Sequence, residues 1–368
     1  MKFFGTILIL GMILISTACS GKKSDAKPND EEPPKETVTS LKGGAIKDLV
    51  LLYHGGTHRL DYTEEQLKPY IYRTGENAKH EWLFDGFLFI EFKDNRGYEY
   101  AKGYGQKPAN KSQWIWLTTR NFEKGKGVDA LNTSLKNLSE KSVVPKRMRK
   151  VVLTLPDPII GNKTWGDLNG KNLDFDVTED RIAACKWYVD YVIEKWEEQG
   201  YDQLDFKGFY WVAETQRDSW DVLQEISKHI KSKGLEFYWI PYFYAEGAVD
   251  WEKSGFDHAY QQPNYFFQTD RPYSLLTNSI KRSNDYNMGL EMEFDSKVSQ
   301  PEFAKRFYDY INAFKDGGVW DSKPVAYYEG GGTWLEMSKG GATLKKMYND
   351  LSDIVVERQE RADKEAKL

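Results

Sequence analysis

The sequence predicts an α/β fold, a (β/α)8 TIM-type barrel with a long insertion after the second strand. Eight short apolar segments follow one another between residues 46 and 350, and helical patterns separate most of them. This order of elements is typical of such a barrel. A doubly wound open sheet is the alternative. It is disfavoured because the first segment ends in His54-Gly55-Gly56-Thr57, which matches neither the dinucleotide-binding nor the P-loop pattern.

The expected strands are rich in β-branched and aromatic residues. In chain order they cover residues 49–53, 86–90, 150–155, 206–212, 236–243, 257–262, 288–294 and 324–328. Helix boundaries carry capping signals: Thr63 and Gln66 fit a capping box, and Gly200 and Gly234 follow helical segments. Helices are expected from residue 63 onward and at 129–138, 178–199, 219–232, 271–283, 301–314 and 342–361.

A long insertion, residues 93–147, separates the second and third expected strands. It contains Trp114-Ile115-Trp116 and the helix expected at 129–138. Connections of this length inside a compact domain are more often functional than idle. We therefore expect the insertion to contribute to function.

Two expected strands carry acids among apolar residues. The segment 208–212 runs into Glu214, and the segment 288–294 contains Glu291 and Glu293 and is followed by Asp295. Residues two apart in a strand share a face, so Glu291, Glu293 and Asp295 share one face. Such acids are costly unless they line a wet cavity or take part in chemistry. These strands are the main indication of an active site.

Polar residues also follow the other strands, at the end where a barrel of this type places its catalytic mouth. Carboxylates and amides bind hydroxyls, and aromatic faces bind the apolar side of a sugar ring, so the set suits a polyhydroxylated ligand. The strand-end residues are His54, Asp157, Glu214, Tyr244, Glu246, Gln262, Asn264, Glu291, Glu293, Asp295 and Glu329, beside Trp211, Tyr242, Tyr260 and Trp334. Those predicted to bind substrate are Trp211, Tyr244, Gln262, Asn264, Glu291, Asp295 and Glu329.

The placement of the acids resembles that of the large glycoside-hydrolase clan with (β/α)8 barrels. In that clan a Glu at the end of strand four is the acid/base and a Glu at the end of strand seven is the nucleophile. The resemblance implies these roles for Glu214 and Glu293, and a retaining reaction. Ala213 stands where the clan usually has Asn.

The chain also resembles a family of bacterial lipoproteins catalogued only as a domain of unknown function. The likeness is carried by Leu83-Phe84-Asp85-Gly86-Phe87, Gly208-Phe209-Tyr210-Trp211 and Tyr328-Glu329-Gly330-Gly331. This resemblance implies a barrel in a glycan-related setting.

Cleavage of a glycosidic bond needs one protonated carboxyl, which donates to the leaving oxygen, and one ionised carboxylate. We predict Glu214 and Glu293, preferring Glu293 to Glu291 because it lies nearer the mouth of the barrel. Glu291 is then an inner acid and Asp295 caps the turn. Two alternatives stay open: Glu214 as a structural acid paired with Arg or Lys, and Glu329 as a ligand of its own loop's amides.

Other functions fit the same residues. One is a non-catalytic glycan-binding lipoprotein, since binding uses the same amides and aromatics. Another is a metal-dependent hydrolase using Asp157, Glu214, Glu293 and His258, which the lack of a close His-x-His pattern disfavours. We expect no metal and no cofactor. A carbohydrate is the expected partner.

The amino-acid composition limits the classes of molecule that this protein can bind. The formal charge of −5 offers no net basic field for nucleic acid, which we exclude as a partner. Aromatic residues make up 15% of the chain, with 12 Trp and 23 Tyr. They fit both a large core and platforms on which sugar rings stack.

The N-terminus predicts export. Lys2 precedes an apolar run over residues 3–15, which is too short to span a bilayer and ends in small residues before Cys19. This pattern resembles a bacterial lipoprotein signal, although Ser16 stands where Leu is commoner. We expect a signal peptide at 1–18, lipid on Cys19, a charged and Pro-rich disordered tether at 19–45 and one barrel domain at 46–368. The expected location is the cell envelope, anchored to a membrane and facing the periplasm or the cell surface. Cys185 is then a buried hydrophobe without a disulfide partner.

Overall fold

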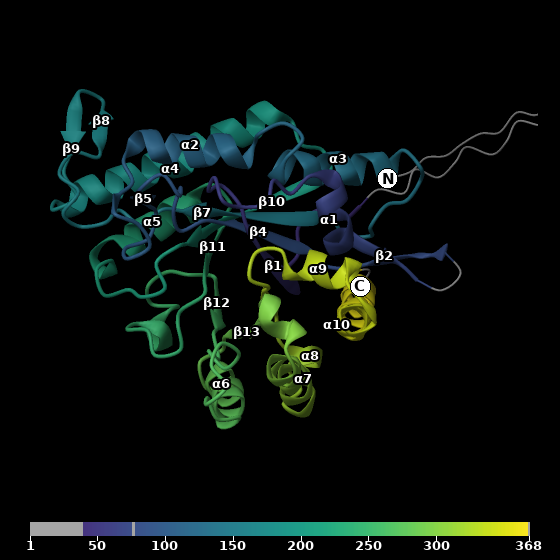
Figure 1. The fold of residues 1–368 in the computed structure, drawn as a ribbon. Coiled ribbons are helices and arrows are strands. Elements are labelled where there is room, and N and C mark those ends of the chain that lie inside the picture. Colours follow the sequence, from purple (N-terminus) through teal and green to yellow (C-terminus); the bar gives the residue numbers. More distant parts are fainter. Residues whose placement is uncertain (1–39, 76–77, 367–368) are drawn as a thin grey trace, which may run out of the picture. The chain divides into compact units, whose positions relative to one another are not determined.

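The computed structural model describes residues 40–75 and 78–366. Its centre is a closed barrel of parallel strands, in which the last strand pairs with the first (Figure 1). The strands are β1 (Asp48–Tyr53), β4 (Gly86–Ile90), β7 (Arg149–Leu155), β10 (Leu204–Trp211), β11 (Glu236–Trp239), β12 (His258–Gln261), β13 (Gly289–Glu293) and β14 (Val325–Tyr328). Each expected strand is present, and closure of the sheet confirms the barrel and excludes the open-sheet alternative.

Helices cover the outside of the barrel (Figure 1). They are α1 (Glu64–Ile71), α2 (Lys111–Asn121), α3 (Gly127–Ser139), α4 (Thr178–Gln199), α5 (Trp220–Ser232), α6 (Ser274–Asp285), α7 (Pro301–Asp316), α8 (Val319–Ser322), α9 (Thr333–Lys339) and α10 (Ala342–Glu365). Small two-stranded sheets pair β2 (Tyr72–Thr74) with β3 (His80–Trp82), β5 (Tyr98–Glu99) with β6 (Lys107–Pro108), and β8 (Gly166–Leu168) with β9 (Lys171–Leu173). The insertion supplies α2, α3 and the β5–β6 pair. At the start of α1, the Gln66 side chain accepts a hydrogen bond from the Thr63 amide at 2.9 Å, as the capping signal predicted.

Alternation along the strands produces two apolar layers. One fills the barrel and includes Leu51, Leu88 and Tyr210. The other lies between the strands and the helices and includes Phe209 and Leu290. Every second residue of a strand points into the barrel, so a residue's position along its strand decides whether its side chain can reach the mouth of the barrel.

Gly208 is required by the backbone of β10. The pairing of β10 with β7 shifts by one residue between Phe206 and Gly208, which is a β-bulge. Gly208 has a φ of +152°, and a Cβ atom there would lie 1.9 Å from the carbonyl oxygen of Glu236. Glycine at this position lets β10 bend beside β11 just before it delivers Glu214.

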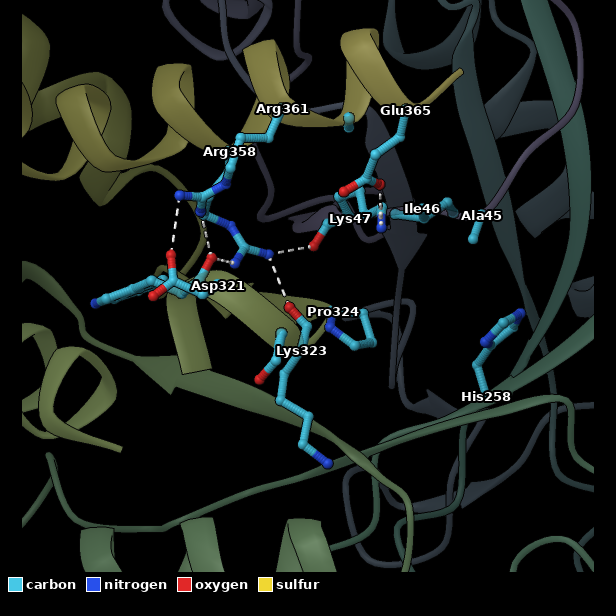
Figure 2. Close-up of a pocket in the computed structure, with 13 residues that line it drawn as sticks. Ala45, Ile46, Lys47, His258, Asp321, Lys323, Pro324, Arg358, Arg361 and Glu365 are labelled. Atoms are coloured by element: carbon cyan, nitrogen blue, oxygen red, sulfur yellow. Dashed lines mark hydrogen bonds and ion pairs between the residues drawn. The ribbon is translucent and has the colours of Figure 1, made fainter. Parts of the chain in front are cut away.

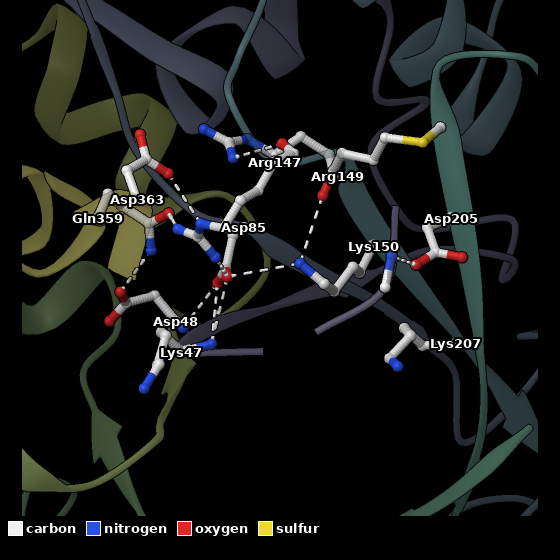
Figure 3. Close-up of polar contacts among 12 residues, drawn as sticks. Lys47, Asp48, Asp85, Arg147, Arg149, Lys150, Asp205, Lys207, Gln359 and Asp363 are labelled. Atoms are coloured by element: carbon white, nitrogen blue, oxygen red, sulfur yellow. Dashed lines mark hydrogen bonds and ion pairs between the residues drawn. The ribbon is translucent and has the colours of Figure 1, made fainter. Parts of the chain in front are cut away.

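The amino-terminal ends of the strands are closed by a buried ionic network (Figure 3). The carboxylate of Asp85, just before β4, accepts hydrogen bonds from the Asp48 amide at 2.9 Å and the Arg147 guanidinium at 2.5 Å. Lys150 lies 3.8 Å away. Burial alone would raise the pKa of Asp85, but Lys150 and Arg147 outweigh it and hold that pKa at about 2. The charged groups at this end of the barrel are therefore structural.

The segment before residue 46, where the barrel domain was predicted to start, already contacts the barrel. The Leu41 amide donates to the carbonyl of Lys146 at 2.8 Å, and its carbonyl accepts from the Met148 amide at 2.9 Å. The C-terminal end of the predicted tether, at Leu41, is therefore hydrogen-bonded to the segment that leads into β7. The signal peptide, Cys19 and the rest of the tether lie outside the described residues. Within the described residues, no helix has the length and apolarity to cross a membrane.

Candidate active site

A cavity of about 570 Å³ opens at the carboxyl ends of the strands, and we call it the mouth cavity. Strands from all around the barrel contribute to it, so its walls combine residues far apart in sequence. Its polar and aromatic lining includes Tyr53, His58, Arg59, Phe92, Lys93, Tyr104, Tyr210, Glu214, Tyr242, Gln262, Asn264, Phe267, Glu291, Glu293 and Tyr328. This size lies within the range of about 300–1,000 Å³ that is usual for small-molecule sites.

Glu214 follows the end of β10 and reaches this cavity. Its carboxylate accepts a hydrogen bond from the Gln262 amide at 3.0 Å and another from the Tyr104 hydroxyl at 3.2 Å. No Lys or Arg pairs with it among the described residues. Burial raises the pKa of Glu214, and the two hydrogen bonds only partly oppose that shift. Burial therefore favours the protonated form of this carboxyl, which an acid catalyst needs.

Glu293, the last residue of β13, is held by donors around it. The Tyr310 hydroxyl on α7 and the Tyr265 amide, at 3.3 Å, both donate to its Oε2 atom. Burial raises the pKa of Glu293 to about 7, and the hydrogen bond from Tyr310 and the backbone amides oppose that shift only in part. The Glu293 carboxylate is therefore fixed in position by α7 and by the loop after β12.

Glu291 lies two residues deeper on the same face of β13, as the alternation predicted. It is buried, and no described residue donates a hydrogen bond to its Oε1 atom. Burial raises the pKa of Glu291 well above its usual value, and the charges of Glu293 and Glu214 raise it further. Of the three carboxyls, Glu291 is the one most strongly favoured to be neutral.

The basic side chains of the mouth cavity, Arg59 and Lys93 among them, follow strands β1 and β4. Arg59 forms a two-point contact with Glu91, with both nitrogen–oxygen distances at 2.9 Å, and its guanidinium lies 4.5 Å from the Tyr53 ring centre. Glu91 also accepts from the Gly56 amide at 2.7 Å. These contacts fix Arg59 and Tyr53 as a rigid wall.

Tyr104 is the main contribution of the insertion, and strand-end reasoning did not identify it. Its ring stacks on Phe92 at 4.4 Å between centroids, which brings its hydroxyl to Glu214. The only sequence signal was the length of the insertion. Tyr53 and Tyr328, the final residues of β1 and β14, were also not singled out, although their positions at strand ends could have indicated them.

The structure brings four of the predicted substrate-binding and catalytic positions together with Glu214: Gln262, Asn264, Glu291 and Glu293 all line the mouth cavity. Tyr244 lies in a neighbouring cavity and is 71% exposed.

Three other predicted positions lie outside the mouth cavity. Trp211 is fully buried against Phe237 in the outer apolar layer. Its neighbour in β10, Tyr210, points into the barrel, and adjacent residues of a strand point to opposite faces of the sheet. Asp295 accepts from the Lys297 amide at 2.8 Å and caps the turn. Glu329 is fully buried and accepts from the Gly332 and Trp334 amides of its own loop, the second of the two roles left open for it.

The residues of the metal-hydrolase alternative are not assembled. His258 starts β12, at the opposite end of the barrel from Glu214, and contacts Glu236 at 3.1 Å. In the described part of the chain, no group of three His, Cys, Asp or Glu side chains is arranged to hold a metal ion.

A smaller cavity of about 130 Å³ lies at that opposite end (Figure 2). Its cations are already engaged: Arg358 donates to the carbonyls of Lys47 and Lys323, and Arg361 pairs with Asp321 at 2.9 Å. The mouth cavity is therefore the stronger candidate for the site.

The fold and its mouth define a (β/α)8-barrel protein with an acidic, tyrosine-lined site at the carboxyl ends of the strands. The chain belongs to the family described as "Domain of unknown function (DUF4855)", whose model matches residues 48–353. No curated protein matches it in sequence.

Several solved structures are similar in fold. A GH113 β-1,4-mannanase is 10% identical, with 83% of this chain and 97% of that one covered and a TM-score of 0.43. The intracellular xylanase TsXylA of Thermoanaerobacterium saccharolyticum is 7% identical, with 79% and 90% covered and a TM-score of 0.40. Concanavalin B is 9% identical, with 82% and 98% covered and a TM-score of 0.38. These similarities concern the fold and do not assign a reaction.

Proposed function

We propose that this protein is a glycoside hydrolase that cleaves an oligo- or polysaccharide outside the cytoplasm, with Glu214 and Glu293 as its catalytic carboxyls. The observation that carries the proposal is that Glu214 on one strand end and Glu293 on another, with two strands between them, line one cavity of about 570 Å³. Tyrosines and amides complete its walls. Two carboxyls facing one sugar-sized cavity are what glycosidic cleavage requires.

The roles follow those of the glycoside-hydrolase clan that the placement of these acids resembles. Protonated Glu214 donates its proton to the glycosidic oxygen as that bond breaks. Ionised Glu293 attacks the anomeric carbon and forms a covalent glycosyl ester. Glu214, now ionised, then takes a proton from water, whose oxygen attacks the anomeric carbon and releases Glu293. The two displacements together retain the configuration at that carbon.

Glu293 rather than Glu291 suits the role of nucleophile. Donors from Tyr310 and Tyr265 favour the ionised form that the attack needs. Glu291 lacks a donor on its Oε1 atom, and its pKa is raised well above that of an ordinary Glu. As a neutral acid it can donate a hydrogen bond to a sugar hydroxyl.

The test is a panel of oligo- and polysaccharides incubated with the mature protein, with released sugars measured by chromatography. Cleavage of at least one glycan is the expected result, and proton NMR of the first product should show retained anomeric configuration. Inversion would contradict the nucleophilic role of Glu293. Binding without any released product would favour a non-catalytic glycan-binding protein.

We also propose that Cys19 carries a lipid that anchors the protein to a membrane of the bacterial cell envelope. The support is the apolar run after Lys2, which ends in small residues directly before Cys19. Cys19→Ser should move the protein from the membrane fraction to the soluble fraction, as measured by immunoblotting after cell fractionation. Ser24→Ala, a change in the tether, is the control and should stay with the membranes. Membrane retention of Cys19→Ser with an intact N-terminus would contradict the proposal.

A further inference from the structure

A second cavity of about 610 Å³ adjoins the mouth cavity, and we call it the outer cavity. Loops after β7, β10 and β11 form it together with the insertion. The two cavities share Tyr104, Glu214 and Tyr242. A ligand that occupies both cavities must therefore pass the carboxyl of Glu214.

Asp157 lies in the wall of the outer cavity, two residues after β7, and is only 7% exposed. Among the described residues, none forms a hydrogen bond or ion pair with its carboxyl group. Burial raises the pKa of Asp157 to about 7, although the charge of Arg181 opposes this shift. The carboxyl of Asp157 reaches the cavity, where a ligand hydroxyl can bind it in place of water.

Three tyrosines at the outer cavity are partly exposed. The exposed fractions are 71% for Tyr244, 43% for Tyr242 and 42% for Tyr104. Tyr244 meets Phe243 edge to face, with ring centroids 4.2 Å apart. Fixed aromatic faces beside a carboxyl offer a sugar ring both an apolar platform and a hydrogen-bond acceptor.

The charges of the outer cavity disfavour an acidic ligand. Four acidic side chains and two basic side chains line it. Both cations are already paired: Lys102 lies 2.8 Å from Asp218, and Arg217 lies 3.2 Å from Glu246. Among the described residues that line the outer cavity, an anionic sugar would therefore find no cation that is not already paired.

From this geometry we infer that the outer cavity is a subsite for the leaving-group portion of the substrate, an uncharged sugar residue whose hydroxyl binds Asp157 and whose ring packs on the exposed tyrosines. The inference rests on the proposed function, because Glu214 must act between the two cavities. It adds that the protein acts on glycans with a neutral sugar on the leaving side of the cleaved bond.

The test compares two substrates that share the transferred sugar: an oligosaccharide and an aryl glycoside with no leaving-side sugar. Asp157→Ala and Tyr244→Ala should each lower kcat/KM for the oligosaccharide about 10-fold more than for the aryl glycoside, because a hydrogen bond or a stacking platform is lost on one side only. Asp202→Ala and Tyr286→Ala, at exposed positions outside both cavities, are the matched controls.

Direct binding separates this inference from the catalytic proposal. In calorimetry with the same oligosaccharide, Asp157→Ala should raise Kd about 10-fold whether or not the wild type cleaves it. Equal losses for both substrates together with an unchanged Kd would overturn the subsite while leaving the hydrolase intact. Weaker binding in a protein that cleaves nothing would overturn the hydrolase and keep the outer cavity as a sugar-binding site.

Discussion

Glu293→Gln is expected to lower kcat for a cleaved glycan by at least about 10³-fold while Kd changes little. The substitution removes the nucleophile but keeps the shape of the side chain, so the sugar still fits the mouth cavity. The measurements are single-turnover kinetics for cleavage and calorimetry for binding. Formate, which can occupy the space left by a truncated carboxylate, should partly restore turnover of Glu293→Ala.

Glu214→Gln should behave differently because it removes the acid. The loss should reach about 10²–10⁴-fold for sugar leaving groups and be much smaller for activated aryl glycosides, which leave with little protonation. Glu291→Gln is the matched control on the same face of β13. It should raise KM more than it lowers kcat. A larger fall in kcat for Glu291→Gln than for Glu293→Gln would exchange their roles, and wild-type rates in all three variants would make these acids structural.

Asp85→Asn is expected to destabilise the barrel by about 3–5 kcal/mol, the usual cost of removing one partner from a buried ionic network. The change leaves Arg147 and Lys150 buried around a neutral amide (Figure 3). Denaturant unfolding followed by circular dichroism measures the free energy of unfolding. Asp285→Asn removes an exposed partner of Lys281 on α6 and should change stability far less.

The pH dependence of stability gives an independent check on Asp85. Its pKa is about 2 in the folded protein and near 3.8 without the fold, so its contribution is fully present above about pH 5. That contribution, roughly 2–3 kcal/mol, should disappear as the pH falls from about 5 to 1. Asp85→Asn should lose less stability over this interval than the wild type. Parallel curves for the two proteins would show that the carboxylate does not stabilise the fold.

Much of the fold could be predicted because its signals are local. The eight strands are short apolar segments bounded by Gly, Pro or polar residues, and chain order alone placed them in a parallel barrel. The two acids of β13 could be assigned to one face because alternation depends only on the spacing of residues along a strand. The closed sheet agrees with that assignment of fold.

The rest depended on contacts between distant segments. Alternation shows which residues share a face but not which face points inward, so only closure of the barrel placed Trp211 against Phe237 and Tyr210 inside. Tyr104 reaches Glu214 because its ring stacks on Phe92, a contact that insertion length alone could not identify.

Hydrogen-bond partners were likewise decided by tertiary structure. Glu293 is the last residue of β13, and Glu329 directly follows β14. The Glu329 carboxylate accepts hydrogen bonds from the amides of its own loop, whereas Glu293 lines the mouth cavity and accepts a hydrogen bond from Tyr310. The sequence by itself determined the strands, their order and the acids they carry. Only the packed chain decided which acids face a common cavity, because that depends on the competing donors that folding brings to each carboxylate.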